Sequence, residues 1–227
     1  MIKKQKSPRS GFTLIELLVV ISIILIASSI IFIGGNAGGG ASLSSSQRIV
    51  SGIAQGARGQ AILKNAKTRL IIHNDPSDLD QYRRFFGIVY YGTDSAGLEG
   101  WIAATQGTSL PDGIYFDAAT SASESGASWS ATNMPLEYPR TSAQTTGSTN
   151  YLYYEFNSNG TSANSNAYLV IRAGTMIPNA TGAQVSQLKV SEEDSGLKSA
   201  LIFRRAGTTT AVNEPDVIQA SSVTEIK

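Results

Sequence analysis

The sequence predicts an α+β fold in which one long N-terminal helix packs on an antiparallel, β-rich head. Three observations predict it: an apolar run at residues 12–33, helical periodicity at residues 41–64, and short β-like runs after residue 64. Strands that arrive as hairpins after one long helix favour antiparallel sheets packed on that helix. The expected parts are a leader at 1–11, a helix at 12–64 and a head at 65–227.

The apolar run follows a basic leader that carries Lys3, Lys4, Lys6 and Arg9. As a helix with a rise of ~1.5 Å per residue, residues 12–33 would be about 33 Å long, enough to cross a bilayer core. Basic residues on the leader side place the leader in the cytoplasm. The sequence therefore predicts a single-pass protein of the cytoplasmic (inner) membrane with its head on the periplasmic or extracellular side.

Glu16 is the unusual residue of this run. A carboxylate in a membrane helix costs roughly 2.5–3.5 kcal/mol at mid-bilayer by insertion scales, and it usually marks a function. The stretch GFTLIELLVV at residues 11–20, after a short basic leader, resembles the class III signal of type IV pilins and pseudopilins. In that family a glutamate at this position belongs to the assembly signal.

The resemblance implies three events at the N-terminus. A prepilin peptidase would cleave between Gly11 and Phe12, Phe12 would be N-methylated, and the helix would pack into the core of a filament. Gly11 offers no side chain where a protease must grip the backbone. Glu16 lies one turn beyond Phe12, near the positive end of the helix dipole, and would neutralise the Phe12 amine of a neighbouring subunit.

A plain signal anchor or a secretory signal peptide is the alternative for this stretch. The basic n-region fits it, and residues 39–41 form a small-residue cleavage site. However, the apolar run exceeds the roughly 7–15 residues of a signal-peptide h-region, and Glu16 would have no purpose. The pilin-type interpretation is therefore favoured.

Glycine dominates residues 34–40 and predicts a break in the helix. Each glycine costs about 0.8–1 kcal/mol against alanine inside a helix. The segment is either a flexible linker between anchor and head or a segment that is helical in the membrane and extended in a filament. The sequence leaves both open.

Residues 41–64 predict an amphipathic helix, with capping hydroxyls at Ser44–Ser46. A glycine pair spaced by four, Gly52 and Gly56, would let another helix approach closely, or the glycines only loosen an exposed helix. The face expected to pack on a sheet is Leu43, Val50, Ala54, Ala57 and Ala61. The opposite face is Arg48, Gly52, Gln55, Gly56 and Gly59.

After residue 64 the sequence indicates strands separated by turn signals. Asn159-Gly160 predicts a turn between two of them, and residues 206–208 predict another. The Ser/Thr/Ala/Gly-rich residues 118–150 suit an exposed polar loop rather than a core element. The expected strands are 68–73, 83–91, 98–105, 113–117, 151–157, 168–173, 200–204 and 209–213.

A second, weaker resemblance concerns the head. Residues 57–65 followed by 70–72, Trp101 followed by 110–113, and 156–160 leading to 168–171 resemble the H-type minor pseudopilins and the FimT-like minor pilins. This resemblance implies a minor subunit. Many pilins carry a disulfide-closed loop near the C-terminus, and this chain departs from that pattern because it has no cysteine.

Composition argues against several kinds of chemistry. Without the leader, 14 basic side chains face 17 acidic ones, a net charge of −3 that offers no basic excess for nucleic acid. His73 is the single histidine, expected at a surface or turn, so a multi-histidine metal site cannot be built. Asp75, Asp78 and Asp80, or the acidic residues 192–194, could hold Ca²⁺, but solvated turns are favoured.

The sequence therefore predicts a structural subunit, not an enzyme, without cofactor or metal. It would serve a type IV pilus or a type II secretion pseudopilus. Its expected partners are the prepilin peptidase, other pilin or pseudopilin subunits and the inner-membrane assembly platform. The competing hypothesis is a non-polymerising, membrane-tethered binding module that presents residues 118–150 to a ligand.

Overall fold

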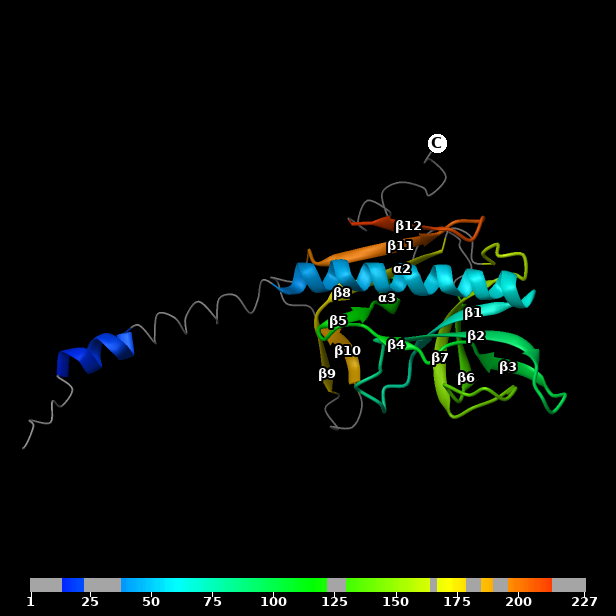
Figure 1. Cartoon of the computed structure of the whole chain (residues 1–227), viewed down its shortest axis with the longest axis horizontal. Coiled ribbons are helices and arrows are strands. Elements are labelled where there is room, and N and C mark those ends of the chain that lie inside the picture. Colours follow the sequence, from blue (N-terminus) through cyan, green and yellow to red (C-terminus); the bar gives the residue numbers. More distant parts are fainter. Residues whose placement is uncertain are drawn as a thin grey trace, which may run out of the picture. The chain divides into compact units, whose positions relative to one another are not determined.

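The computed structural model describes residues 14–22, 38–121, 130–163, 167–178, 185–189 and 196–213. The chain divides into two units, one up to Gly38 and one from Gly39. Residues 14–22 of the first unit form a helix. The long helix α2 (Gly38–Lys64) begins at the boundary, and the second unit combines it with antiparallel sheets, which confirms the predicted mixture of helix and antiparallel sheet (Figure 1).

Helix α2 packs on the head through the predicted face. Its five apolar residues are all buried, and alanine at three of these positions lets the helix lie close to the strands. The five residues predicted for the opposite face are all exposed. The buried set is Leu43, Val50, Ala54, Ala57 and Ala61.

Helix α2 begins earlier than expected. The predicted break at 34–40 is wrong for residues 38–40, which form the first turn, while residues 34–37 lie outside the described residues. The first four N–H groups of any helix lack an intrahelical partner, so glycine is tolerated better in the first turn of a helix than in its interior. Ser46 is not a cap, because its hydroxyl donates to the Ser42 carbonyl one turn earlier, at 2.7 Å.

The first sheet contains six strands. Five of them run antiparallel in the order β3-β2-β1-β7-β6, and β4 (Thr108–Ser109) also pairs with β2. The central strand β1 has the predicted bounds, and its Ile71 lies opposite Gly87 on one side and Tyr153 on the other. The five strands are β1 (Thr68–His73), β2 (Phe85–Thr93), β3 (Glu99–Ala103), β6 (Ser130–Leu136) and β7 (Thr149–Phe156).

The second sheet contains four strands, in the order β12-β11-β8-β5. These are β5 (Ile114–Phe116), β8 (Tyr168–Ala173), β11 (Lys198–Phe203) and β12 (Thr209–Val212). The turn at residues 206–208 joins β11 to β12 as predicted, with Gly207 at a φ of 79°. Helix α3 (Ala118–Ser121) follows β5, and β9 (Thr175–Pro178) pairs with β10 (Val185–Lys189).

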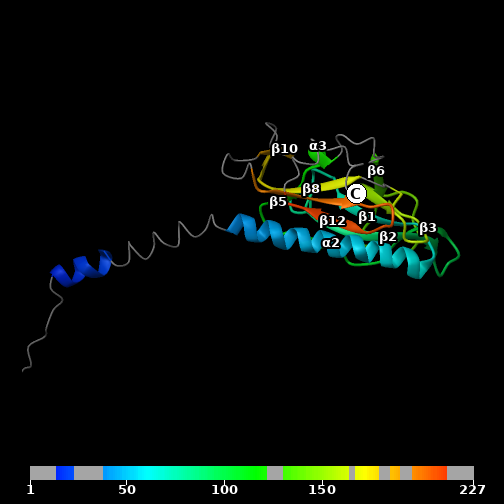
Figure 2. The same ribbon diagram turned by 90° about the horizontal axis from the view of Figure 1, so that it is seen from above.

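Both sheets lie against the same helix and share one apolar core (Figures 1 and 2). Tyr154 of β7 stacks on Phe203 of β11, with ring centroids 4.2 Å apart. The buried Tyr154 hydroxyl donates to the Tyr168 carbonyl of β8 at 2.9 Å. This ring pair and this hydrogen bond therefore join the two sheets.

The predicted turn at Asn159-Gly160 is confirmed, but the two strands that flank it do not pair with each other. The turn itself forms, because Gly160 N–H donates to the Asn157 carbonyl at 2.8 Å and Gly160 has a φ of 78°. However, β7 pairs with β1 and β6, whereas β8 pairs with β5 and β11. The turn therefore carries the chain from one sheet to the other.

The expected polar loop at 118–150 is wrong for several of its residues. Residues 118–121 form α3, and 130–136 form β6, on which Met134 and Leu136 are buried. The following connection reaches the opposite edge of the sheet, where Gln144 and Trp101 exchange two backbone hydrogen bonds of 2.8 and 3.1 Å. A second apolar cluster lies here: Ile71, Val89, Met134, Leu136 and Tyr151.

Candidate functional site

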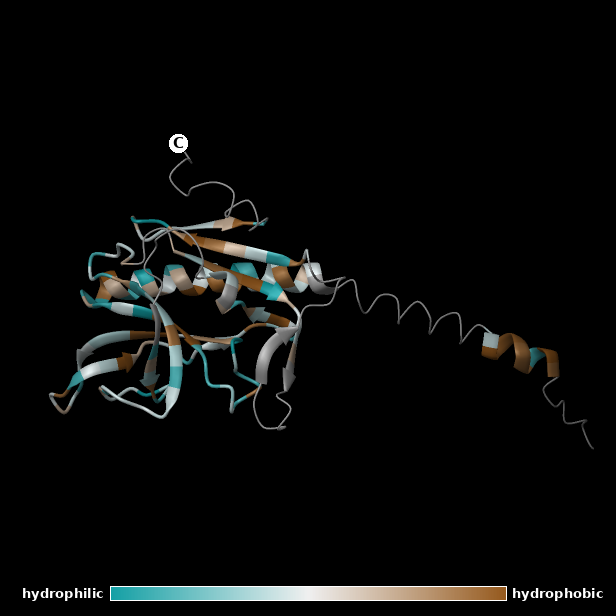
Figure 3. Cartoon of the chain, turned by 180° about the vertical axis from the view of Figure 1, so that it is seen from behind, coloured by the Kyte–Doolittle hydropathy of each residue, from teal (hydrophilic) through white to brown (hydrophobic). Residues whose placement is uncertain are grey.

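The helix at residues 14–22 presents a continuous apolar surface. Its seven large apolar side chains are 48–81% exposed, and the helix is mostly brown in Figure 3. Ser22 does not interrupt this surface strongly, because its hydroxyl donates to the Leu18 carbonyl of the same helix at 2.8 Å. Among the described residues, no helix combines the length and the apolar character needed to cross a bilayer.

Glu16 lies in the first turn of this helix and is exposed. It is the one charged side chain among residues 14–22. A carboxylate on an otherwise apolar surface favours a cationic partner wherever that surface becomes buried. Gly11 and Phe12 lie outside the described residues, so cleavage and methylation there stay predictions.

The outward face of α2 is the second candidate surface. A Cβ added at Gly52 or at Gly59 would meet nothing within 4 Å, and one added at Gly56 would meet only the Ile88 Cδ1 at 3.3 Å. Gln55, on the same face, donates to the Thr209 hydroxyl at 3.1 Å. The glycines therefore expose bare helix backbone, which agrees with both interpretations offered by the sequence.

His73 is buried rather than at the surface, so the sequence expectation is wrong. It shares a face of β1 with Ile71, and its ring contacts Tyr151 edge-on at a centroid distance of 5.4 Å. Burial lowers the pKa of His73, although Asp78 and Asp75 oppose this by their negative charge. Burial therefore disfavours the protonated imidazole.

The acidic residues after β1 form turn contacts. Asp75 accepts hydrogen bonds from the Ser77 hydroxyl and backbone N–H at 2.7 and 3.0 Å, and these bonds lower the pKa of Asp75. Asp78 accepts from Gln81 N–H at 3.2 Å. Within the part of the chain that the structure describes, no three such residues gather to hold a metal ion. Residues 192–194 lie outside that part.

Sequence reasoning missed a cluster around Arg69. This side chain lies over the rings of Trp101 and Tyr153, at 4.1 and 3.8 Å from their centroids, and its Nε donates to Glu155 at 2.8 Å. The four residues come from three strands that are distant in sequence. The available signal was a single arginine inside the otherwise apolar core of the predicted strand at 68–73.

Two solved structures of a pseudopilin are similar to this chain. The chain is similar to the minor pseudopilin EpsH from the Type 2 Secretion System of Vibrio cholerae, at 13% identity over 75% of this chain and 96% of that chain, with a TM-score of 0.40. A second structure of that pseudopilin matches at 14% identity over 77% and 96%, also with a TM-score of 0.40. No curated protein sequence matches the chain.

The N-terminal segment has a match of its own. Residues 6–32 match the family model of the prokaryotic N-terminal methylation motif. This range contains the basic end of the leader, Gly11, Phe12, Glu16 and most of the apolar run. The match confirms the resemblance that the sequence indicated for this segment: the chain carries a prepilin-type N-terminal methylation motif at residues 6–32.

Proposed function

We propose that this chain is a structural subunit, a minor pilin or pseudopilin, of a type IV pilus or a type II secretion pseudopilus. The methylation motif at residues 6–32 carries the proposal. In this proposal the prepilin peptidase removes residues 1–11 and Phe12 becomes the methylated N-terminus. The chain stays in the cytoplasmic membrane until the assembly platform adds it to a filament of related subunits.

The apolar surface of residues 14–22 supports a buried destination for this helix. The leucine, isoleucine and valine side chains of this helix are about half exposed or more. Burying them would gain roughly 25 cal/mol of free energy for each Å² of apolar surface removed from water. Soluble monomers rarely leave such a contiguous apolar patch uncovered. Lipid would cover it before assembly, and the helices of neighbouring subunits would cover it afterwards.

Glu16 provides the specificity of assembly in this proposal. A charged carboxylate in hydrocarbon is costly, so it favours a site that supplies a cation. The amine of a methylated Phe12 on a neighbouring subunit is such a cation, because methylation retains the positive charge. Pairing these two groups would fix the axial position at which an incoming subunit stops.

The head supports a role at the filament surface. Helix α2 buries one face in the core of the head and leaves Arg48, Gly52 and Gly59 exposed along the other. In this proposal the head stands outside the membrane, and the exposed side of α2 faces other subunits.

A pair of substitutions in the N-terminal helix tests the proposal. Glu16→Ala should leave membrane insertion and leader cleavage intact while it reduces incorporation into sheared filaments at least tenfold, because one charged pair is lost per contact. Ser22→Ala is the matched control, since the Ser22 hydroxyl bonds within its own helix. Membrane and filament fractions of both variants are compared with the parent by immunoblot. Wild-type incorporation of Glu16→Ala would contradict the assembly role, and absence of the parent from filaments would favour the tethered binding module.

A further inference from the structure

A pocket of about 220 Å³ opens beside the second apolar cluster of the head. Strands β1, β3, β6 and β7 all contribute to its wall. Arg69, Trp101 and Tyr153 supply a cation and two aromatic rings, and Asn133 and Thr145 supply an amide and a hydroxyl. Ligand sites commonly combine aromatic walls with a few polar groups in this way.

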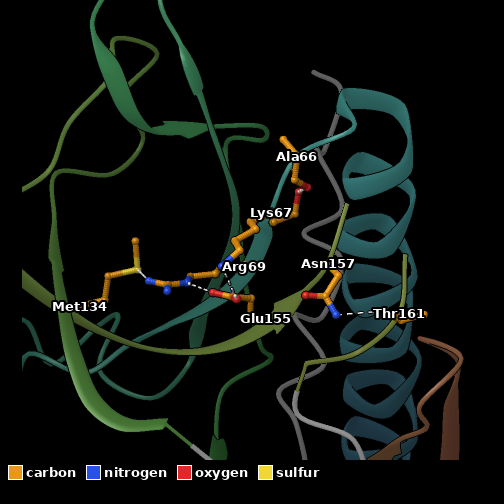
Figure 4. A network of polar contacts seen from close by, with 8 residues as sticks. Ala66, Lys67, Arg69, Met134, Glu155, Asn157 and Thr161 are labelled. Atoms are coloured by element: carbon orange, nitrogen blue, oxygen red, sulfur yellow. Dashed lines mark hydrogen bonds and ion pairs between the residues drawn. The ribbon is translucent and has the colours of Figure 1, made fainter. Parts of the chain in front are cut away.

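Arg69 is held in one position at the wall of this pocket. Trp101 and Tyr153 come from strands on either side of β1, and both rings contact the guanidinium. The Nε group donates to Glu155 at 2.8 Å (Figure 4). The Arg69 side chain is only 19% exposed. A cation already fixed by rings and an ion pair loses little side-chain entropy when it binds a ligand.

The remaining N–H donors of Arg69 lack strong hydrogen-bond acceptors among the described residues. Its Nη1 donates to the Met134 sulfur at 3.2 Å, and a thioether is a weak acceptor (Figure 4). Among the contacts of the described residues, Glu155 is the one oxygen acceptor that Arg69 has. A guanidinium carries five N–H donors, so this mostly buried group can satisfy further acceptors in the pocket.

The charge around the pocket favours an anion with a single charge. Among the described residues, Arg69 is the one charged residue in its wall. Lys67 lies 3.8 Å from the Glu155 carboxylate, so Arg69 and Lys67 both lie beside this acid. A carboxylate matches both that charge and the planar geometry of a guanidinium, whereas a phosphate dianion would exceed it.

We propose that this pocket binds a carboxylate group attached to a flat or apolar body. Arg69 and the Asn133 amide would donate to the carboxylate, and the rings of Trp101 and Tyr153 would flank the body. The carboxylate belongs either to a small organic acid or to the C-terminal end of a peptide. This site is separate from the N-terminal helix, so it does not depend on the proposed subunit function.

Tryptophan fluorescence of the full chain in detergent micelles tests the proposal. The sequence has two tryptophans, so a Trp129→Phe background leaves Trp101 as the reporter. Benzoate probes for a small acid, and N-acetyl-Gly-Phe probes for a peptide end. Benzamide and the amide of N-acetyl-Gly-Phe are the uncharged controls. Each acid that binds should give a saturable change, with affinity at least tenfold above that of its amide.

Substitutions assign the binding to the pocket. Arg69→Gln should weaken the acids at least tenfold, because it removes the charged donor. Arg140→Gln is the matched control, since Arg140 is exposed and lies outside the pocket wall, and it should change affinity by less than about twofold. Thr145→Val removes the hydroxyl of an exposed wall residue, so it should weaken the acids about threefold while the melting temperature stays unchanged.

The two probes distinguish a peptide end from a small organic acid. Saturation by N-acetyl-Gly-Phe alone would assign the site to a peptide end, and saturation by benzoate would assign it to small acids. The proposal is overturned if neither acid saturates below about 10 mM, if the amides bind equally well, or if Arg69→Gln binds like the parent.

Discussion

Replacing the two open glycines of α2 by alanine should stabilise the head. Gly52 and Gly59 lie inside the helix, and an added Cβ would meet nothing within 4 Å at either position. Each change to alanine therefore gains about 0.8–1.0 kcal/mol of helix propensity without a clash. The two positions are about 10 Å apart along the helix, so the gains should add to about 2 kcal/mol.

The assay is thermal unfolding followed by circular dichroism at 222 nm. A gain of about 2 kcal/mol should raise the melting temperature by about 4–8 °C. Gly56→Ala should gain less, because its Cβ would press on the Ile88 methyl at 3.3 Å. Ala57→Gly, on the buried face, should lose at least about 1 kcal/mol. A double variant that melts at or below the parent temperature would refute the exposed position of these glycines.

The double variant also separates the two interpretations of the glycines. If they seat a neighbouring helix, the more stable protein should enter filaments less well, because two methyl groups hold the helices apart. If they only loosen an exposed helix, filament incorporation should match the parent. Quantitative mass spectrometry of sheared filaments measures this ratio.

Two further predictions concern the head. His73 has a lowered pKa, so the unfolded chain binds its proton more readily, and stability should fall as the pH drops below about 6.5. In the His73→Phe variant the denaturation midpoint should change less between pH 7.5 and 5.5, a window in which no other side chain ordinarily titrates. If the midpoint changes with pH as in the parent, His73 is not the cause of the pH dependence. Gly207→Ala should cost more than Gly97→Ala. Both have a φ of 79°, but only at Gly207 would the Cβ overlap the Gly160 carbonyl, 1.8 Å away. Equal losses in urea denaturation would contradict that contact.

Local patterns predicted much of the fold. The spacing of Leu43, Val50, Ala54, Ala57 and Ala61 identified the buried face of α2 because helical periodicity depends only on neighbouring residues. The bounds of β1 and β8 were also as predicted, since both are short runs of β-branched and apolar residues.

Strand pairing and edge strands were harder. Strand β6 has the sequence SATNMPL, and its proline and small polar residues give no strand signal. It is an edge strand whose hydrogen bonds depend on pairing with β7. The Asn159-Gly160 turn was predicted correctly, but its local signal did not show that the flanking strands β7 and β8 lie in different sheets. His73 was expected at the surface because its burial depends on Tyr151, a residue far along the chain.

The candidate sites also differ in whether their residues are contiguous in the sequence. The motif around Gly11, Phe12 and Glu16 is contiguous, so the sequence alone indicated it. The pocket around Arg69 is assembled from four strands and the residues after β6, and no spacing along the chain predicts that arrangement.

The most direct test of the subunit proposal is the intact mass of the protein purified from membranes of cells that contain a prepilin peptidase. The purified protein should have lost residues 1–11 and should carry one methyl group on Phe12. Deletion of the peptidase gene is the control and should restore the full-length, unmethylated mass. A mature protein that keeps its leader, or that begins near Ala41, would contradict the account and indicate a plain anchor or a secreted domain.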